Sequence, residues 1–453
     1  MLVVFTVLLF TSATHANPVP PAPMLPRIVQ GQPGEGGSAK TPLTQPRNTI
    51  DIATYSGAAG DGVMDDTARV QRALTVCSDL GWTCVIPANK TFLVTREIYM
   101  WGGANLVGTD ATSKILLSTG SVPYILNIGI SGVQQLKPKW TGTIDHVTFQ
   151  GVGAGSGRIV FFWRSEGATL SHNVFDVGAY HYGPTSSGNN NAIVVDGNMN
   201  YIRKNITITD NTILATGTDV IGSEGIGLGQ WDGAEIARNT VSGVGDDMIG
   251  IHFSNNINIH DNNLSGVDGR LFVSNSRHVT IANNKVARMA SGLTGLWYQG
   301  IALLYIGHEA NATNNNYAPT NITVQGNTLT YPAGAIDNGA AIYIYGPRNV
   351  TVINNTVVNN SSTINVTGLH LLPHAFTGGA VWTDPGGLDP TTVSRVHDVT
   401  ISGNNLSAGA YHLPLVETGA LCTHYVGVVT ITNNTARGYS FICNPVNGAN
   451  ITN

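Results

Sequence analysis

Short runs of alternating apolar and polar residues recur along this chain, and many of them end in the pattern apolar-x-x-Asn-x-apolar. Several intervals between copies are about 22 to 28 residues long, a period typical of solenoids built from stacked coils. Val, Ile and Thr dominate the runs, which predicts short β-strands, and the frame of leucine-rich repeats is absent. The recurring asparagines are Asn173, Asn211, Asn239, Asn262, Asn284, Asn327, Asn355, Asn404 and Asn434.

These asparagines are expected to lie at the turns between strands. Asn tolerates left-handed backbone conformations and forms local hydrogen bonds, so it suits a corner. Coils of a solenoid pair at about 4.8 Å, and stacked Asn side chains can then form a ladder. We interpret the series as architecture and not as catalytic chemistry.

The stretch before the repeat predicts a short amphipathic helix followed by two strands. The helix is expected to begin at Asp65-Asp66-Thr67, with an apolar face of Ala68, Val70, Ala73, Leu74 and Cys77. The strands are expected around Cys84 and Phe92. We attribute Asp61, Asp65 and Asp66 to loop and helix-cap chemistry and not to a metal site.

The chain resembles the pectate-lyase-like superfamily in three consecutive features: the run GDGVMDDT at 60–67, the helix, and the run VIPANKTFLV at 85–94. The resemblance implies an all-β fold, a right-handed parallel β-helix with a short N-terminal capping helix, over residues 49–453. It implies no single activity, because polygalacturonases, lyases, glucanases, epimerases and phage tailspikes share this fold.

Composition and the N-terminal segment indicate the compartment and the kinds of binding partner to expect. Residues 1–16 combine a short apolar run with a small-x-Ala end and predict a secretory signal peptide, and residues 17–48 predict a flexible leader. No later stretch is apolar enough for a membrane anchor, and a net charge of −5 without a Lys/Arg block argues against nucleic acid as a binding partner.

The four cysteines suit an oxidising compartment, with Cys77–Cys84 and Cys422–Cys443 as the simplest of three possible disulfide pairings. The protein is therefore expected to be secreted, extracellular or periplasmic; monomer and homo-oligomer both stay open.

Two consecutive segments predict a concentration of acids. At an offset of 23 residues, Ile226-Gly227-Leu228 falls on Ile249-Gly250-Ile251, and Glu224 falls on Asp247 with Asp246 beside it. Equivalent positions of adjacent coils lie about 5 Å apart, within the range of separations that paired glycosidase carboxylates use. Crowded like charges also raise the pKa of one member, which supplies a general acid.

The acid segments are also similar to the polygalacturonase family, in which one coil carries Asn-Thr-Asp-Gly and the next Gly-Asp-Asp before an apolar strand. Here Gly245-Asp246-Asp247 matches the second element, and Glu224 replaces the aspartate of the first. The resemblance implies that Glu224, Asp246 and Asp247 are catalytic, one protonating the leaving oxygen and the others activating water for an inverting attack. The family's Gly-His-Gly and Arg-x-Lys elements have no match, so galacturonate is not implied as the substrate.

Further residues are candidates for holding a polysaccharide. Arg270 lies one coil beyond the acids, His252 follows them on the strand, and Trp231, Trp297 and Tyr298 offer aromatic stacking surfaces, although each is also compatible with ordinary packing. Tyr180-His181-Tyr182 is a similar case. The segment 366–395 departs from the repeat and is expected to form a long excursion beside the cleft.

Two other function classes stay open beside the hydrolase, which is expected to need no cofactor. A lyase or uronate epimerase would use the three acids to hold Ca²⁺, with Arg270 or Lys204 as the base. A non-catalytic adhesin or polysaccharide-binding β-helix would use none of these acids chemically.

Overall fold

The structure is a computed structural model. It describes residues 48–117, 124–129, 137–151, 158–162, 164–176, 190–195, 202–215, 223–266, 269–289, 302–307, 319–333, 340–345, 348–361, 367–372, 397–406, 417–418, 429–435 and 449–452. The chain divides into two units between residues 45 and 46, and residues 46–453 form the larger one. The expected signal peptide and nearly all of the expected leader lie outside the described residues.

Three parallel sheets, here called A, B and C, make up the larger unit. Sheet A contains β1 (Thr49–Asp51), β3 (Thr83–Ile86), β6 (Asn105–Gly108), β9 (Thr143–Asp145), β12 (Glu166–Ser171), β15 (Arg203–Thr209), β18 (Trp231–Ala237), β21 (Asn255–His260), β24 (Arg277–Ala282), β27 (Thr320–Gln325), β30 (Arg348–Ile353), β33 (His397–Ser402), β35 (Val429–Thr432) and β36 (Ala449–Thr452). Sheet B contains β2 (Asp61–Asp65), β4 (Thr91–Val94), β7 (Lys114–Leu117), β10 (Thr148–Gly151), β13 (Val174–Asp176), β16 (Thr212–Leu214), β19 (Thr240–Val244), β22 (Asn263–Gly266), β25 (Lys285–Arg288), β28 (Thr328–Tyr331) and β31 (Thr356–Asn359). Sheet C contains β5 (Ile98–Met100), β8 (Tyr124–Ile128), β11 (Arg158–Phe162), β14 (Asn190–Val195), β17 (Ser223–Gly229), β20 (Asp247–His252), β23 (Arg270–Ser274), β26 (Ala302–Gly307), β29 (Ala340–Tyr345), β32 (Thr367–Leu372) and β34 (Glu417–Thr418).

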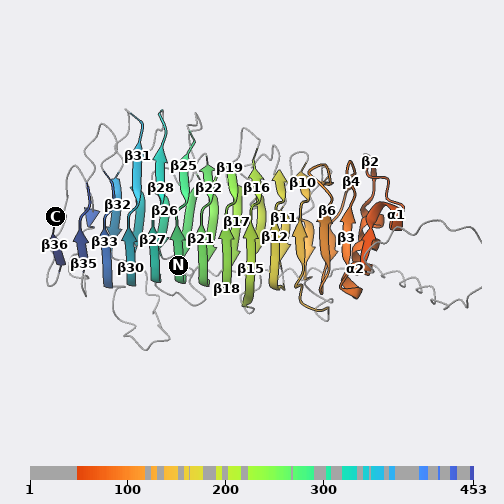
Figure 1. Ribbon diagram of the computed structural model, residues 1–453, viewed down its shortest axis with the longest axis horizontal. Helices are drawn as coiled ribbons and strands as arrows, with labels where there is room; N and C mark the ends of the chain where they lie inside the picture. Colours follow the sequence, from red (N-terminus) through yellow and green to blue (C-terminus); the bar gives the residue numbers. More distant parts are fainter. Residues whose placement is uncertain are drawn as a thin grey trace, which may run out of the picture. The chain divides into compact units, whose positions relative to one another are not determined.

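Through the middle of the chain, each coil contributes one strand to sheet C, then one to sheet A and one to sheet B. Each strand pairs in parallel with the equivalent strand of the next coil, as in Ile226↔Ile249 and Ile236↔Ile259. Figure 1 shows these coils stacked side by side along one axis. The structure therefore confirms the parallel β-helix that the repeat and the N-terminal signature predicted.

The core is a column of aliphatic side chains that point inward from all three sheets. Ile226, Leu228, Ile249 and Ile251 of sheet C are fully buried, as is Ile236 of sheet A. Side chains of such strands alternate between the two faces, so the residues between these positions point outward. Each such burial contributes about 1.5–3 kcal/mol, which makes the core the main source of stability.

The asparagine ladder is confirmed. Asn239 donates from its backbone N and its Nδ2 to Oδ1 of Asn262, at 2.9 and 3.0 Å, and Asn262 repeats both contacts to Asn284. The ladder continues through the series, and all its members except Asn434 are at most 1% exposed. The side chains therefore satisfy backbone groups that the corners would otherwise bury without partners.

The left-handed residue of each corner is not the ladder asparagine but the residue before it. His172, Asp210, Arg238, Asp261 and Asn283, for example, have φ between 53° and 60°. The expectation that the ladder asparagines themselves take this conformation was therefore wrong. They serve the corner through their amide hydrogen bonds, and their outward-facing predecessors make the bend.

Two helices occupy the N-terminal end of the stack, α1 (Ile52–Ser56) and α2 (Thr67–Leu80). The predicted α2 buries Val70, Ala73, Leu74 and Cys77, whereas Ala68 is exposed. The short α1 was not predicted. A disulfide joins Cys77 to Cys84 and so ties α2 to β3, as expected. The proposed Cys422–Cys443 bridge lies outside the described residues.

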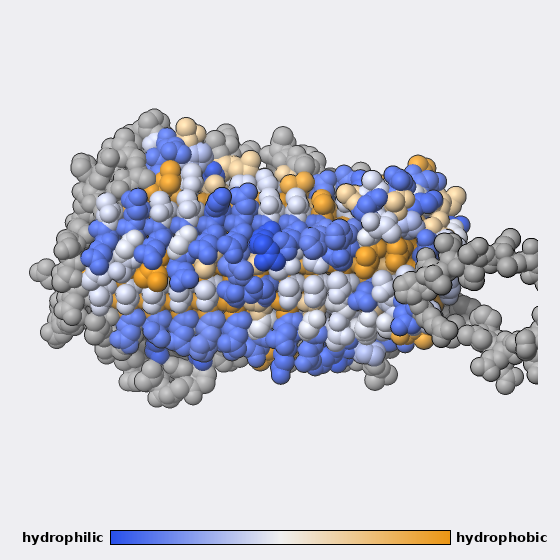
Figure 2. Space-filling model, in the orientation of Figure 1, coloured by the Kyte–Doolittle hydropathy of each residue, from blue (hydrophilic) through white to orange (hydrophobic). Residues whose placement is uncertain are grey.

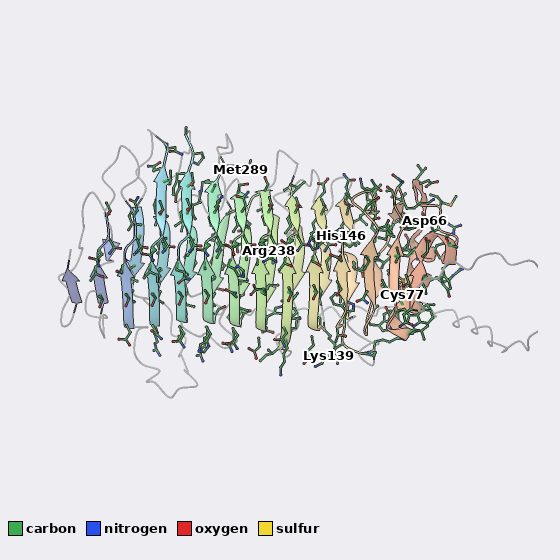
Figure 3. The ribbon with its side chains drawn as sticks, viewed as in Figure 1. Asp66, Cys77, Lys139, His146, Arg238 and Met289 are labelled. Atoms are coloured by element: carbon green, nitrogen blue, oxygen red, sulfur yellow. A yellow bond between two sulfur atoms is a disulfide. The ribbon has the colours of Figure 1, made fainter. Side chains whose placement is uncertain are left out.

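The acids of the N-terminal signature make loop contacts, as expected. The buried carboxylate of Asp66 accepts from the backbone N of Ala59 at 2.9 Å and of Gly60 at 2.8 Å. Figure 3 shows Asp66 and Cys77 at the helical end of the stack.

Two other expectations can be compared with the structure. Residues 367–372, the first part of the expected excursion at 366–395, form β32 and so continue sheet C. Residues 373–395 lie outside the described residues. Within the described part of the chain, neither helix is long and apolar enough to cross a membrane.

Replacing Asn262 with Ala is predicted to destabilise the protein by about 3 kcal/mol or more, because it leaves several buried backbone groups of the corner without partners. Asn263→Ala is the matched control, because Asn263 is exposed and adjacent, and its loss should cost less than about 0.5 kcal/mol. Urea denaturation followed by tryptophan fluorescence measures both. Equal midpoints for the two variants would contradict a stabilising role for the ladder.

Candidate functional site

The two acid-bearing segments lie on adjacent strands of sheet C in the predicted register. Ile226 pairs with Ile249, Gly227 with Gly250, and Leu228 with Ile251. Glu224 on β17 is half-buried, Asp246 directly precedes β20, and Asp247 is its first residue. The structure thus brings together the three acids that the offset of 23 residues singled out.

Two paired glycines make room for the carboxylates on the outer face of sheet C. A Cβ atom at Gly227 would lie 2.8 Å from Oε2 of Glu224, and one at Gly250 would lie 3.1 Å from Oδ2 of Asp247. Each carboxylate therefore lies over the glycine three residues later on its own strand. Because the glycines are neighbours across one ladder, we place the two carboxylates on the order of one strand spacing apart, about 5 Å.

Arg270, from the following coil, binds Asp247. β23 pairs with β20 so that Arg270 is opposite Asp247, and its Nε donates to Oδ1 of Asp247 at 2.6 Å. Its Nη2 lies 4.0 Å from Oδ1 of Asp246, and the Arg270 side chain is only 8% exposed. A guanidinium in this position stabilises the ionised carboxylate of Asp247. Arg270 thus contacts Asp247 directly; the sequence had left open whether it holds the substrate or packs against a strand.

His252 also lies at the site. Its Nε2 would be 3.2 Å from a Cβ at Gly250, on the same glycine that Asp247 covers, and its Nδ1 lies 3.0 Å from Oγ of Ser274. A serine hydroxyl on Nδ1 fixes the ring, so Nε2 faces the space over Gly250. The sequence left open whether His252 packs in a turn; the structure places it on the strand beside the acid.

A row of aromatic side chains, not identified from the sequence, continues from the acids along sheet C. In the ladder, Gly250 is followed by Phe272, Tyr305 and Tyr343. The ring centroids of Phe272 and Tyr305 are 4.9 Å apart, and those of Tyr305 and Tyr343 are 5.2 Å apart, each pair stacked. Phe272 is buried and supports the Arg270 guanidinium, which lies 4.2 Å from its ring centroid, while both tyrosines are half-buried. We call Phe272, Tyr305 and Tyr343 the aromatic row.

A sequence signal for this row exists. Leu271-Phe272-Val273, Leu304-Tyr305-Ile306 and Ile342-Tyr343-Ile344 share the apolar-x-apolar frame of Ile249-Gly250-Ile251. Aligning the chain on this frame, instead of on the asparagines, would have found them.

Trp231 was wrongly expected to offer a stacking surface. It begins β18 of sheet A and is 1% exposed, because the left-handed Gln230 (φ 60°) turns the chain so that the indole packs in the core. Lys204, the alternative base, is exposed on β15 of sheet A, away from the acids on sheet C. Trp297, Tyr298 and the run 180–182 lie outside the described residues.

Chemically, the site offers an ionised carboxylate, two further carboxyl groups, an imidazole and an adjoining aromatic surface on a sheet face. Such a set can transfer protons to and from an extended substrate. It can also bind a cation through oxygen ligands, although Arg270 already supplies positive charge to Asp247.

Comparisons with known proteins agree with this architecture. A search of curated proteins finds no match. Among solved structures, the A-module of the mannuronan C-5 epimerase AlgE6 of Azotobacter vinelandii superimposes with a TM-score of 0.56 and 13% identity, over 89% of this chain and 97% of that one. The surface protein and adhesin PfbA of Streptococcus pneumoniae gives 0.54 and 13%, over 89% and 100%. A DFA-IIIase of Arthrobacter chlorophenolicus in complex with DFA-III gives 0.53 and 12%, over 87% and 100%.

At these identities the structural likeness shows the fold alone. The family model described as right handed beta helix region matches residues 131–436, which is more than half of the chain. The chain therefore belongs to the family of proteins with a right-handed β-helix region.

Proposed function

We propose that this protein is an exported enzyme that hydrolyses glycosidic bonds of a polysaccharide on the outer face of sheet C. The observation that carries the proposal is the position of Glu224 and Asp247 over the paired Gly227 and Gly250, with Arg270 bound to Asp247. A carbohydrate-active protein is also supported by analogy with the mannuronan epimerase and the DFA-IIIase complex.

The arrangement suggests how the roles divide. Because Arg270 keeps Asp247 ionised, Asp247 is the base that accepts a proton from the attacking water. Glu224, the carboxyl group on the neighbouring coil, carries the proton that goes to the leaving oxygen. The resemblance of Gly245-Asp246-Asp247 to the polygalacturonase element favours direct attack by water with inversion, although a carboxylate separation of about 5 Å is the one typical of retaining glycosidases. His252 positions Asp247 or the water over Gly250.

The aromatic row gives the substrate a direction. Tyr305 and Tyr343 are one and two coils beyond Phe272, so a chain lying along sheet C would pass from the acids onto two half-buried rings. Flat amphipathic rings suit the apolar faces of sugars while leaving their hydroxyls hydrated.

Replacing Asp247 with Asn is predicted to lower kcat by about 10²–10⁴-fold, because the amide cannot accept the proton of water. The measurement is release of reducing ends from a panel of pectins, alginate, dextran, β-glucans and bacterial exopolysaccharides, with absorbance near 230 nm recorded in parallel. Glu224→Gln should lose a similar factor, whereas Glu235→Gln, at a half-buried position on sheet A, should keep full activity.

The same assay separates the other function classes. Unsaturated products absorbing near 230 nm, abolished by EDTA, would assign the acids to a Ca²⁺ site and make the protein a lyase. Tight polysaccharide binding that is unchanged in Asp247→Asn, without cleavage of any substrate in the panel, would make it a binding protein and contradict the proposal.

Replacing Tyr305 with Ala is predicted to raise KM by about five- to tenfold, equivalent to roughly 1–1.4 kcal/mol of lost stacking, while kcat changes little. Tyr305→Phe is the control, because it keeps the ring and its stacking on Phe272 and Tyr343. A KM for Tyr305→Ala equal to that of the wild-type enzyme would show that the substrate does not lie over the aromatic row.

A further inference from the structure

A second cluster of chemically active side chains lies at the corner between sheets A and B, away from the acids on sheet C. Asp145 ends β9 of sheet A, and His146 follows it at the corner. His172 holds the equivalent corner one coil later, after Ser171 at the end of β12. Figure 3 shows His146 between the sheet A and sheet B strands, and Figure 2 shows hydrophilic side chains gathered in bands along this face.

The two imidazoles are stacked by the repeat itself. Both histidines have a left-handed backbone conformation, with φ of 56° and 53°. Their ring centroids are 4.7 Å apart, and the ring planes are 21° from parallel. The centroid separation is close to the spacing of adjacent coils. Because the rings stand on equivalent corners, the backbone holds them together without a contribution from flexible loops.

Asp145 joins the two rings. Its Oδ2 lies 2.8 Å from Nδ1 of His146, and its Oδ1 lies 3.0 Å from Nδ1 of His172. Ser171 donates from Oγ to the same Oδ1 at 2.7 Å, which fixes the carboxylate. Burial alone would raise the pKa of Asp145, but the hydrogen bonds from Ser171, His172 and His146 outweigh it and lower that pKa. One carboxylate therefore holds both imidazole rings in place.

We propose that Asp145, His146 and His172 form a binding site for one divalent transition-metal ion, with Zn²⁺ as the representative ion. One ligand atom from each residue lies within 4.8 Å of the other two. The ion enters between the two imidazoles and the carboxylate, in place of the hydrogen bonds that join Nδ1 of each ring to Asp145. Its remaining positions are open to water, because the side chains of His146 and His172 are 49% and 52% exposed.

The ligand set selects the class of ion. Imidazole suits Zn²⁺, Cu²⁺ and Ni²⁺, whereas Ca²⁺ and Mg²⁺ take oxygen ligands. The next acid along the row of corners, Asp210, is already neutralised, because Nε and Nη2 of Arg238 each donate to it at 2.8 Å. Asp145 is therefore the carboxylate that serves this site.

Isothermal titration with ZnCl₂, on protein without a polyhistidine tag, tests the proposal. Wild-type protein should bind one Zn²⁺ per chain at this site, with uptake weakening as the pH falls and protons compete. His146→Asn and His172→Asn should each weaken the binding by at least about tenfold. Asn is compatible with the corner, since Asn283 and Asn354 hold equivalent positions with φ of 56°.

The matched control is His278→Asn. His278 is exposed and has a left-handed backbone conformation like the other two, with φ of 51°, but its ring nitrogens face the side-chain amides of Asn255 and Asn321, each at 2.8 Å. This variant should bind Zn²⁺ as the wild type does. In thermal melts, Zn²⁺ should raise the Tm of the wild type and of His278→Asn but not of His172→Asn, because an ion bound only by the folded state stabilises it.

Two results would overturn the proposal. One is a wild-type protein that takes up no Zn²⁺ in the titration. The other is uptake that is as tight in the double variant His146→Asn/His172→Asn as in the wild type, which would place the metal elsewhere. Circular dichroism establishes that the variants are folded before either result is read.

Discussion

The parallel pairing of each coil with the next is the constraint on which every other feature depends. It fixes residues of adjacent coils one above the other, as Ile226 lies beside Ile249, and the asparagine ladder prevents that register from slipping at the corners. A slip by one residue would turn the core side chains outward. Because each ladder amide bonds both its own coil and the next, register and burial are maintained together.

The acid site is one consequence of this register. Glu224, Asp247 and Arg270 come from three consecutive coils, and none of these segments alone would hold a carboxylate, a second carboxylate and a guanidinium in contact range. The glycines at 227 and 250 remove side chains at the point where the carboxylates lie. The aromatic row then extends the same line of positions along the sheet.

The corners supply a second line of positions with different chemistry. Their left-handed residues carry no core function, so the sequence there can vary: a histidine pair, then Asp210 bound to Arg238, then Asp261, and after it asparagines alternating with glycines. The outer face of a sheet presents a row of side chains along which an extended polymer can bind, whereas the corners present pairs of neighbouring side chains that can bind a single ion. The fold thus places two kinds of chemistry on two separate lines along one stack.

The sequence alone determined the architecture, because a repeated period and a repeated apolar-x-apolar frame can be satisfied only by stacking. It also determined which acids meet, since Glu224 and Asp247 share one offset with their flanking strands. What it could not determine was the direction and the contacts of individual side chains at coil ends. Trp231 packs inward because Gln230 bends left-handed before it, and Arg270 contacts Asp247 instead of solvent because Phe272 supports it from the same strand. Those outcomes depend on backbone conformation and on neighbours from other coils, which periodicity does not encode.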